Sequence, residues 1–263
     1  MKTERRSPSA RITRRGPHPV RFRTLRVLRK ARLAPHYARI TLGGDLTGFV
    51  SEGADDHVKL FFPDPGARAM TPPTLVDGRP QLTPEQRARM RDFTPRRYDV
   101  AAGELVIDFA LHEHGVASEW ARRAAVGDVL GAGGPRGSFV VRYDFDWYLL
   151  VGDEAGLPAI GRRLEELPAG AEVFVVAQVE GPDEELELPG SPTLRWIHRS
   201  RGDSLVDAVR ALDLPGGDGF VFAGAENAEV RALREHVFDE RGIPREHTRI
   251  SAYWKRGAGN FHE

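Results

Sequence analysis

The sequence predicts two domains of different class, an antiparallel β-barrel over residues 20–143 and a parallel-sheet α/β domain over residues 144–263. In the first half, short runs of alternating apolar and polar residues are separated by Gly and Pro. In the second half, continuous apolar runs alternate with helical patterns, and the change of period falls near Asp144. A chain of 263 residues is long enough to fold into both domains.

Composition excludes several classes of protein. The 38 basic and 38 acidic residues balance, so no overall field recruits nucleic acid or an anionic membrane. The absence of cysteine excludes disulfides, thiolate nucleophiles, iron–sulfur clusters and cysteine-based zinc sites. No apolar run approaches the roughly 20 residues that span a bilayer, and no signal-peptide core is present. We therefore expect a cytoplasmic protein that neither inserts in membranes nor binds nucleic acid. We also expect it to be a monomer, although composition does not bear on this.

The first domain is expected to begin after a flexible tail. Residues 1–19 carry basic side chains among Ser, Pro and Gly, with too little apolar surface to offset the entropy of ordering. Strands are predicted within residues 22–28, 38–42 and 58–62. Residues 63–84 form an unusually long connection, which ends in a capping box at Thr83 with Pro84 at the first helical position. A short helix from Pro84 should deliver Arg91 to the next strand.

The stretch of residues 91–99 brings a guanidinium, an aromatic ring and a hydroxyl to a strand edge, from Arg91, Phe93 and Thr94. Arg offers a planar fork to phosphate oxygens, and Phe93 points to the same side of the strand. This combination suits a flat, phosphorylated cofactor. The alternative is a basic strand edge that discourages aggregation.

Two further segments of the barrel are compatible with phosphate. A strand over residues 104–111 has one clear apolar face and ends at His112. The next segment, residues 115–125, predicts a helix that opens with small residues, whose uncovered amides and dipole attract anions. The Gly-rich turn over residues 133–138 allows close backbone approach and carries Arg136.

The second domain alternates strands with helices. Strands are predicted at residues 147–151, 172–179, 194–198, 220–223 and 249–254, with helices at about 158–167, 204–212 and 226–240. Ligands of such sheets bind at the carboxyl ends of the strands, which here carry Gly152, Gly224 and Trp254. No G-x-G-x-x-G fingerprint is present, so a dinucleotide site is predicted from the fold and the Gly152 turn alone.

Nine segments in order carry a family resemblance. They are residues 56–63 (DHVKLFFP), 91–96 (RDFTPR), 108–112 (DFALH), 117–121 (ASEWA), 134–138 (GPRGS), 152–154 (GDE), 157–160 (LPAI), 223–226 (AGAE) and 253–257 (YWKRG). From about residue 20 to 257 the chain resembles the siderophore-interacting proteins, NAD(P)H-dependent ferric-siderophore reductases of the ferredoxin-reductase-like superfamily. The resemblance implies an FAD-binding barrel and an NAD(P)H-binding α/β domain.

The resemblance also implies roles for individual residues. FAD contacts are expected from Arg91, Phe93, Thr94, Asp108, His112, Ala117, Ser118, Gly134, Arg136, Gly137, Ser138 and Trp254, and NAD(P)H contacts from Asp153, Glu154, Pro158, Ala223, Gly224 and Glu226. Phe93 replaces the more usual Tyr, which removes a phenol hydrogen bond but keeps stacking. Ala155-Gly156 stands where Thr-Ala is common, so a hydroxyl near the nicotinamide is lost. We assign no catalytic acid–base residue and no metal ligand.

The implied reaction carries electrons from NADH or NADPH through FAD to a ferric siderophore and releases Fe(II), which hard oxygen ligands bind less tightly than Fe(III). An anionic siderophore should be guided by basic side chains, for which Lys59, Arg136, Lys255 and Arg256 are the candidates. We expect these four residues to converge over the cleft between the domains. The alternative is scattered surface charge.

Several residues have a simpler interpretation. His112 and His114 could form a metal site, but without a third ligand they suggest a solvated loop-edge pair. Trp120 is favoured as a helix anchor in the core, whereas Trp254 could stack on the flavin or simply pack at a strand end. The Asp153-Glu154 pair could simply be two acidic residues at a helix N-terminus, where the helix dipole favours negative charge.

Two other functions stay open from the sequence. One is a general flavin reductase that serves a ferredoxin or a quinone. The other is a non-catalytic protein that binds a ferric chelate, which would lack a yellow flavin spectrum.

Overall fold

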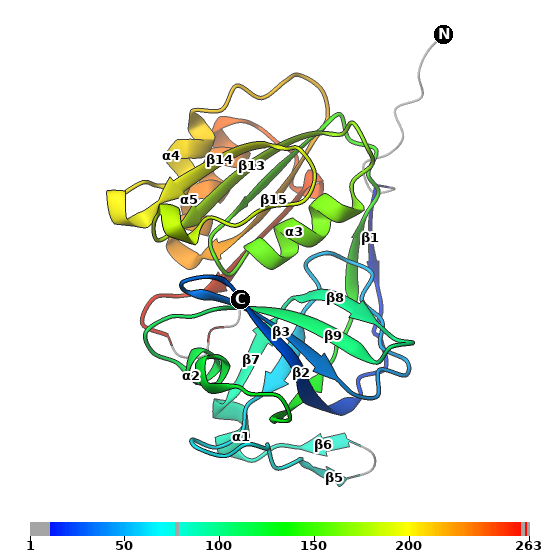
Figure 1. The fold of residues 1–263 in the computed structure, drawn as a ribbon. Helices are drawn as coiled ribbons and strands as arrows, with labels where there is room; N and C mark the ends of the chain where they lie inside the picture. The colour runs from blue at the N-terminus through cyan, green and yellow to red at the C-terminus, as the bar shows by residue number, and fades with distance from the viewer. Residues whose placement is uncertain (1–10, 77–78, 259–260, 262–263) are drawn as a thin grey trace. The chain divides into compact units, whose positions relative to one another are not determined.

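The computed structural model describes residues 11–76, 79–258 and 261, and it divides them into two units (Figure 1). Residues 15–138 form a β-rich unit, and residues from 139 onward, together with residues 11–14, form an α/β unit. An antiparallel sheet and a parallel sheet dominate the two units, which confirms the predicted fold class. None of the described helices combines the length and apolar character needed to cross a bilayer.

Seven antiparallel strands form the main sheet of the β-rich unit, in the order β7-β4-β10-β2-β3-β9-β8. Their bounds are β2 Phe22–Ala34, β3 Tyr37–Gly43, β4 Val58–Phe61, β7 Met90–Phe93, β8 Pro95–Asp99, β9 Glu104–Ala110 and β10 Val129–Gly133. Strands β7 and β8 are the two edges of this sheet, yet only Thr94 separates them in the chain. The sheet must therefore curl until its edges meet, which gives the predicted barrel.

The core of the barrel follows from the alternation of apolar residues. Leu105, Ile107 and Phe109 of β9 are fully buried on the inner face, as the sequence predicts. Helix α2 (Val116–Arg123) packs on β9, and Trp120 on this helix is only 2% exposed. The interpretation of Trp120 as a core anchor is therefore confirmed.

The long connection before Arg91 is partly ordered. It contains a hairpin of β5 (Thr74–Val76) and β6 (Arg79–Gln81). The sequence predicts only a long connection there, without strands. Helix α1 (Pro84–Ala88) follows, with the predicted capping box: the Thr83 hydroxyl accepts from the Gln86 amide at 3.2 Å, and the Thr83 amide donates to the Gln86 side chain at 3.0 Å. This cap fixes the start of the helix that leads into β7.

The prediction of a flexible tail over residues 1–19 needs correction. Residues 1–10 lie outside the described residues, but Ile12–Arg15 form strand β1, which pairs with β11 (Ser138–Val141). The Arg142 amide extends this pairing by donating to the Arg11 carbonyl at 2.7 Å. Main-chain bonding of this kind needs few apolar side chains, which is why composition does not reveal it. The two compact units of the structure divide between residues 138 and 139.

Five parallel strands form the sheet of the α/β unit, in the order β14-β13-β12-β15-β16. The elements are β12 Trp147–Gly152, α3 Leu157–Glu166, β13 Glu172–Val179, β14 Thr193–His198, α4 Leu205–Arg210, β15 Gly219–Glu226, α5 Asn227–Glu235 with a π-helical turn at His236–Glu240, and β16 Thr248–Trp254. All agree with the predicted segments to within a few residues. From β12 the chain adds β13 and β14 on one side of the sheet, and it then returns to add β15 and β16 on the other side. The point between β12 and β15 where the strand order reverses is the switch point, and ligands of such sheets bind there.

Helices cover both faces of the parallel sheet (Figure 1). Leu149, Val151 and Val221 belong to one core cluster with residues of α4 and α5. The alternate residues Phe220 and Phe222 face α3, where the Arg163 guanidinium lies 5.1 and 5.3 Å from their ring centroids. The strands are therefore buried on both faces, which explains why their sequences are continuous apolar runs.

Candidate functional site

Two of the predicted cofactor segments of the barrel, residues 91–94 and 133–138, come together at one row of strand ends. In the pairing of β10, β4 and β7, Gly133 lies opposite Lys59, and Val58 lies opposite Phe93. The Gly-rich turn after β10 therefore lies beside the end of β7, although the two are far apart in sequence. A Cβ built on Gly134 would lie 3.5 Å from the His57 carbonyl, which shows how closely the turn approaches β4.

Arg91 lies on the edge strand β7, as predicted. Its Nη1 atom donates to the carbonyls of Ala88 at 2.8 Å and Met90 at 2.7 Å. Among the described residues no carboxylate pairs with it, and burial, followed by the neighbouring charge of Arg89, lowers its pKa. A half-buried guanidinium that lacks an anion fits a pyrophosphate group, which would supply the missing charge.

Phe93 and Thr94 occupy the join between the two edges of the barrel. The Phe93 ring is half-buried, 4.7 Å from the Phe109 ring and 6.1 Å from the Phe62 ring. Thr94 is only 7% exposed. Phe93 is thus held by the core on one side, and its remaining surface is available to a ligand.

The amino end of α2 offers backbone donors. Its N-cap residue is Gly115, with φ of 119°, and none of the side chains that the structure describes caps the helix. Ala117 is half-buried in the first turn. The Ser118 hydroxyl accepts from the His112 amide at 3.0 Å and lies 3.3 Å from the Ala110 carbonyl, so it ties the helix to the end of β9. An uncapped first turn fits phosphate oxygens through its N–H groups, whereas the Ser118 side chain is already engaged.

Asp108 is engaged within the barrel. Its carboxylate forms two bonds with the Arg39 guanidinium, at 2.7 and 2.8 Å, and its side chain is only 3% exposed. His112, which follows β9, is exposed. In the part of the chain that the structure describes, no three His, Cys, Asp or Glu side chains are grouped to hold a metal ion.

Ser138 closes the Gly-rich turn through a buried network. Its hydroxyl donates to the Asp56 carboxylate at 2.6 Å and accepts from the Glu52 amide at 3.1 Å. Burial raises the pKa of Asp56, although bonds from Ser138, Gly53 and Ser51 act against this. The predicted close approach also holds: a Cβ on Gly137 would lie 2.8 Å from the Arg15 carbonyl. Any cofactor contact at Ser138 and Gly137 would therefore come from the backbone.

In the α/β unit, three glycines meet at the switch point. Gly152 pairs with Gly224 across β12 and β15. A Cβ on Gly156 would lie 2.1 Å from the Gly224 carbonyl, so only glycine fits there. The glycine at residue 156 therefore has a packing cause, because an alanine there would force the start of α3 away from β15. The structure does not explain the alanine at residue 155. Ala223 and Pro158 are buried beside these glycines.

The acidic residues after β12 have different surroundings. Glu154 forms two bonds with Arg199, at 2.7 and 2.8 Å, and this pairing raises the pKa of Arg199. Asp153 is only 1% exposed and accepts the Trp254 indole N–H at 2.7 Å. Glu226 caps α5 by accepting from the Ala228 amide at 2.5 Å. The strand ends thus carry one half-buried ion pair, Glu154–Arg199, and one fully buried carboxylate, Asp153.

The basic residues predicted for the siderophore differ in their pairing. Lys59 is bound to the Asp92 carboxylate at 2.7 and 3.1 Å. Arg136, Lys255 and Arg256 are exposed, and the described residues offer them no ion pair. Lys59 therefore presents less free positive charge than the other three.

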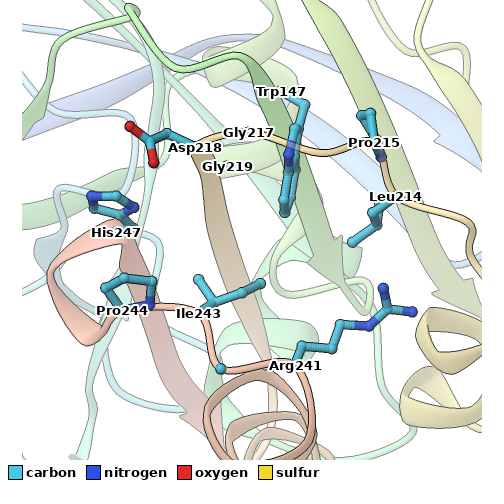
Figure 2. Close-up of a pocket in the computed structure, with 11 residues that line it drawn as sticks. Trp147, Leu214, Pro215, Gly217, Asp218, Gly219, Arg241, Ile243, Pro244 and His247 are labelled. Atoms are coloured by element: carbon cyan, nitrogen blue, oxygen red, sulfur yellow. The ribbon is translucent and has the colours of Figure 1, made fainter. Parts of the chain in front are cut away.

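One cavity of the α/β unit is lined by none of these residues. It has a volume of about 300 Å³. Its lining includes Trp147, Leu214, Ile243 and His247 (Figure 2). Trp147 and Gly219 begin β12 and β15, so the cavity is at the amino ends of the strands. The nucleotide edge of a parallel sheet is the opposite one.

Sequence reasoning missed the side chains that hold the site residues, namely Arg39, Asp56 and Arg199. Each is far in sequence from its partner; Arg39 and Asp108, for example, are 69 positions apart. The one available signal was Asp56, which lies inside the DHVKLFFP segment that carries the resemblance.

Comparison with known proteins identifies the family. Residues 26–139 match the family model of the siderophore-interacting FAD-binding domain, and residues 145–257 match that of the siderophore-interacting protein. The chain belongs to the siderophore-interacting protein family.

Individual relatives agree with this assignment. The chain is 39% identical to an NADPH-dependent ferric-chelate reductase of Escherichia coli, over 93% of this chain and 97% of that protein. It is 31% identical to the ferric vibriobactin reductase ViuB of Vibrio cholerae, over 92% of this chain and 93% of that protein. Among solved structures, a siderophore utilization protein from T. fusca is 36% identical, with a TM-score of 0.84, over 95% of this chain and 99% of that one.

Proposed function

We propose that this protein is a flavoenzyme that uses NADPH or NADH to reduce the iron of a ferric siderophore. The observation that carries the proposal is the half-buried Arg91 guanidinium, which within the described part of the chain binds two backbone carbonyls but no carboxylate. It lies in the unit that matches an FAD-binding domain, and the names of both curated relatives, which describe reductases of ferric chelates, support the proposal.

The residues of each unit would divide the work of binding. Arg91 and the first turn of α2 would hold the FAD pyrophosphate, and Phe93 would contact the flavin ring. Gly152 and Gly224 would keep β12, β15 and the start of α3 packed closely together at the switch point, where the nicotinamide nucleotide would bind. When bound, FAD would supply the conversion of a two-electron donor into single-electron transfers. The chain needs to orient these groups and exclude water, and no acid–base pair is required.

The iron chemistry explains why reduction releases the metal. Hard oxygen ligands bind Fe(III) strongly, and the lower charge of Fe(II) weakens their hold. For the electron donor we propose NADPH, because the Escherichia coli relative is named as NADPH-dependent. A ferredoxin remains an alternative electron partner.

An anaerobic titration tests this function. The purified protein should be yellow, should bleach on addition of NADPH or NADH, and should recover its colour when a ferric siderophore is added, with ferrous iron trapped by a chelating dye. A colourless protein that binds ferric siderophore would instead identify a sequestering protein. Recovery with a quinone or a ferredoxin, but with no ferric siderophore, would identify a general flavin reductase.

The exposed basic residues should affect only the iron step. We expect Lys255→Ala with Arg256→Ala, and separately Arg136→Ala, to slow reduction of anionic ferric siderophores, because these side chains would attract them. Lys59→Ala should have a smaller effect, since Asp92 already pairs with Lys59. Stopped-flow measurement of each half-reaction provides the check.

Salt and ligand charge supply the controls for this prediction. Exposed charges are screened within about 10 Å at 0.1 M salt, so added salt should slow the iron step selectively. If the variants slowed uncharged and anionic ferric chelates equally, or slowed NADPH oxidation as well, the basic residues would not be the siderophore site.

A further inference from the structure

We propose that Asp153 is a positioning residue, whose carboxylate holds the Trp254 indole in place at the nucleotide edge of the parallel sheet. This proposal deepens the proposed function and rests on it for the identity of the ligand. It replaces the sequence-based expectation that the Asp153 side chain contacts NAD(P)H directly.

The carboxylate of Asp153 joins three neighbouring strands. Asp153 follows β12, and its Oδ1 atom accepts from the Ala155 amide at 2.9 Å. Its Oδ2 atom accepts from the Glu226 amide, at the end of β15, at 2.8 Å and from the Trp254 indole, at the end of β16, at 2.7 Å. Three donors on one carboxylate that is 1% exposed leave no surface for a nucleotide. Its role must therefore be exerted through the groups that it binds.

A second carboxylate fixes the same segment. The Glu226 Oε1 atom accepts from the Arg256 amide at 3.0 Å, while Oε2 accepts from the Ala228 amide at the start of α5. Burial alone would raise the pKa of Glu226, but these backbone amides lower it, so this carboxylate stays charged. Residues 254–256 are thus attached at two points, by the Trp254 side chain and by the Arg256 backbone. The orientation of the indole and the path of the basic pair that follows depend on both attachments.

The position of Trp254 matters because of the strand order. The switch point of the sheet lies between β12 and β15. Asp153 directly follows Gly152, the last residue of β12, and therefore lies at this switch point. Trp254 as a whole is half-buried, and its indole N–H is bound to Asp153. A planar ring held beside a dinucleotide crevice can pack against a nicotinamide. Losing the bond would free the ring to rotate away.

The charge of Asp153 makes this attachment sensitive to pH. Burial raises the pKa of Asp153 to about 7, and the charge of Glu154 adds to this, while the Trp254 and Ala155 bonds and the charge of Arg199 act against it. Glu226 faces Asp153 through its backbone amide. Because a protonated carboxyl accepts fewer hydrogen bonds, the Trp254 bond should weaken as the pH falls through about 7.

Indole NMR can test the bond without any cofactor. In protein labelled with ¹⁵N-tryptophan, the four Trp residues give four indole signals, and Trp254→Phe identifies that of Trp254. We expect this signal to shift with a midpoint near pH 7. Asp153→Asn should displace it and abolish the shift, whereas Glu154→Gln should lower the midpoint because it removes a like charge. A Trp254 signal that neither titrates nor responds to Asp153→Asn would overturn the proposal.

Kinetics add a second readout. Asp153→Asn and Trp254→Phe should each slow reduction of the bound flavin by NADPH, about tenfold if one charge-assisted hydrogen bond is lost. The double variant should be no slower than the slower single variant, because both changes remove the same bond. Additive losses would mean that Asp153 acts independently of Trp254.

Two outcomes separate this proposal from the proposed function. If Asp153→Asn fails to fold, the wild-type titration and Glu154→Gln still decide whether Asp153 binds Trp254. If the protein proves not to be a flavoenzyme, the indole signals of the cofactor-free chain remain informative, and only the kinetic readout is lost.

Discussion

Replacing Arg91 with alanine should weaken FAD binding about tenfold or more. A charge-assisted bond from a guanidinium to phosphate contributes roughly 1.5–3 kcal/mol. In this protein the guanidinium is half-buried and has no carboxylate partner among the described residues. Folding has already removed part of its hydration, so less hydration is lost when a phosphate binds. Flavin content after dialysis and the FAD dissociation constant of the reconstituted protein provide the measurement.

Two variants make this prediction specific. Arg91→Lys keeps the charge but loses the planar fork, so its affinity should lie between those of the wild type and Arg91→Ala. Arg87→Ala removes an exposed positive charge from α1, only four residues away, and should leave FAD affinity unchanged. Equal affinities for all these proteins would exclude Arg91 from the flavin site.

Replacing Arg39 with methionine should destabilise the barrel by about 3 kcal/mol, because it leaves the buried Asp108 carboxylate without its counter-ion. The pair is bidentate, at 2.7 and 2.8 Å, and the Asp108 side chain is 3% exposed. Since 32% of the Arg39 side chain stays exposed, the lower end of the usual range for a broken buried pair is appropriate. Urea unfolding of the flavin-free protein, followed by circular dichroism, measures the effect.

The chain contains its own control for that experiment. Arg29 and Glu104 form another bidentate pair, at 3.0 and 2.7 Å, but 62% of the Arg29 side chain is exposed. Arg29→Met should therefore leave the unfolding midpoint nearly unchanged, because water screens the pair. If both variants lowered the midpoint equally, burial would not explain the role of Arg39.

The fold could be predicted because it depends on patterns along the chain. The alternation in β9 and the apolar run of β12 each indicated the correct class of strand, since the first has one buried face and the second has two. Strand β1 escaped prediction because it contains only Ile12 as an apolar residue and is held by main-chain pairing with β11.

The candidate site was predicted less completely, for a different physical reason. Residue type and spacing predicted that Arg91 and Phe93 lie on one strand, and both belong to β7 in the structure. They could not reveal that the side chains of Asp108, Ser118 and Ser138 form internal bonds. Ser138 lies 82 positions from its partner Asp56, and no local pattern encodes a contact of that range.

The strand order of the barrel has a consequence for synthesis of the protein. Strand β2 pairs with β10, so Leu25 lies opposite Leu130 across the middle of the sheet. A nascent chain cannot complete this pairing until β10 has left the ribosome, and until then the apolar face of β2 and β3 is uncovered. Pairings between distant segments also fold slowly. The barrel should therefore depend on chaperones during translation more than the α/β unit, in which the first two parallel strands, β12 and β13, are separated by a single helix.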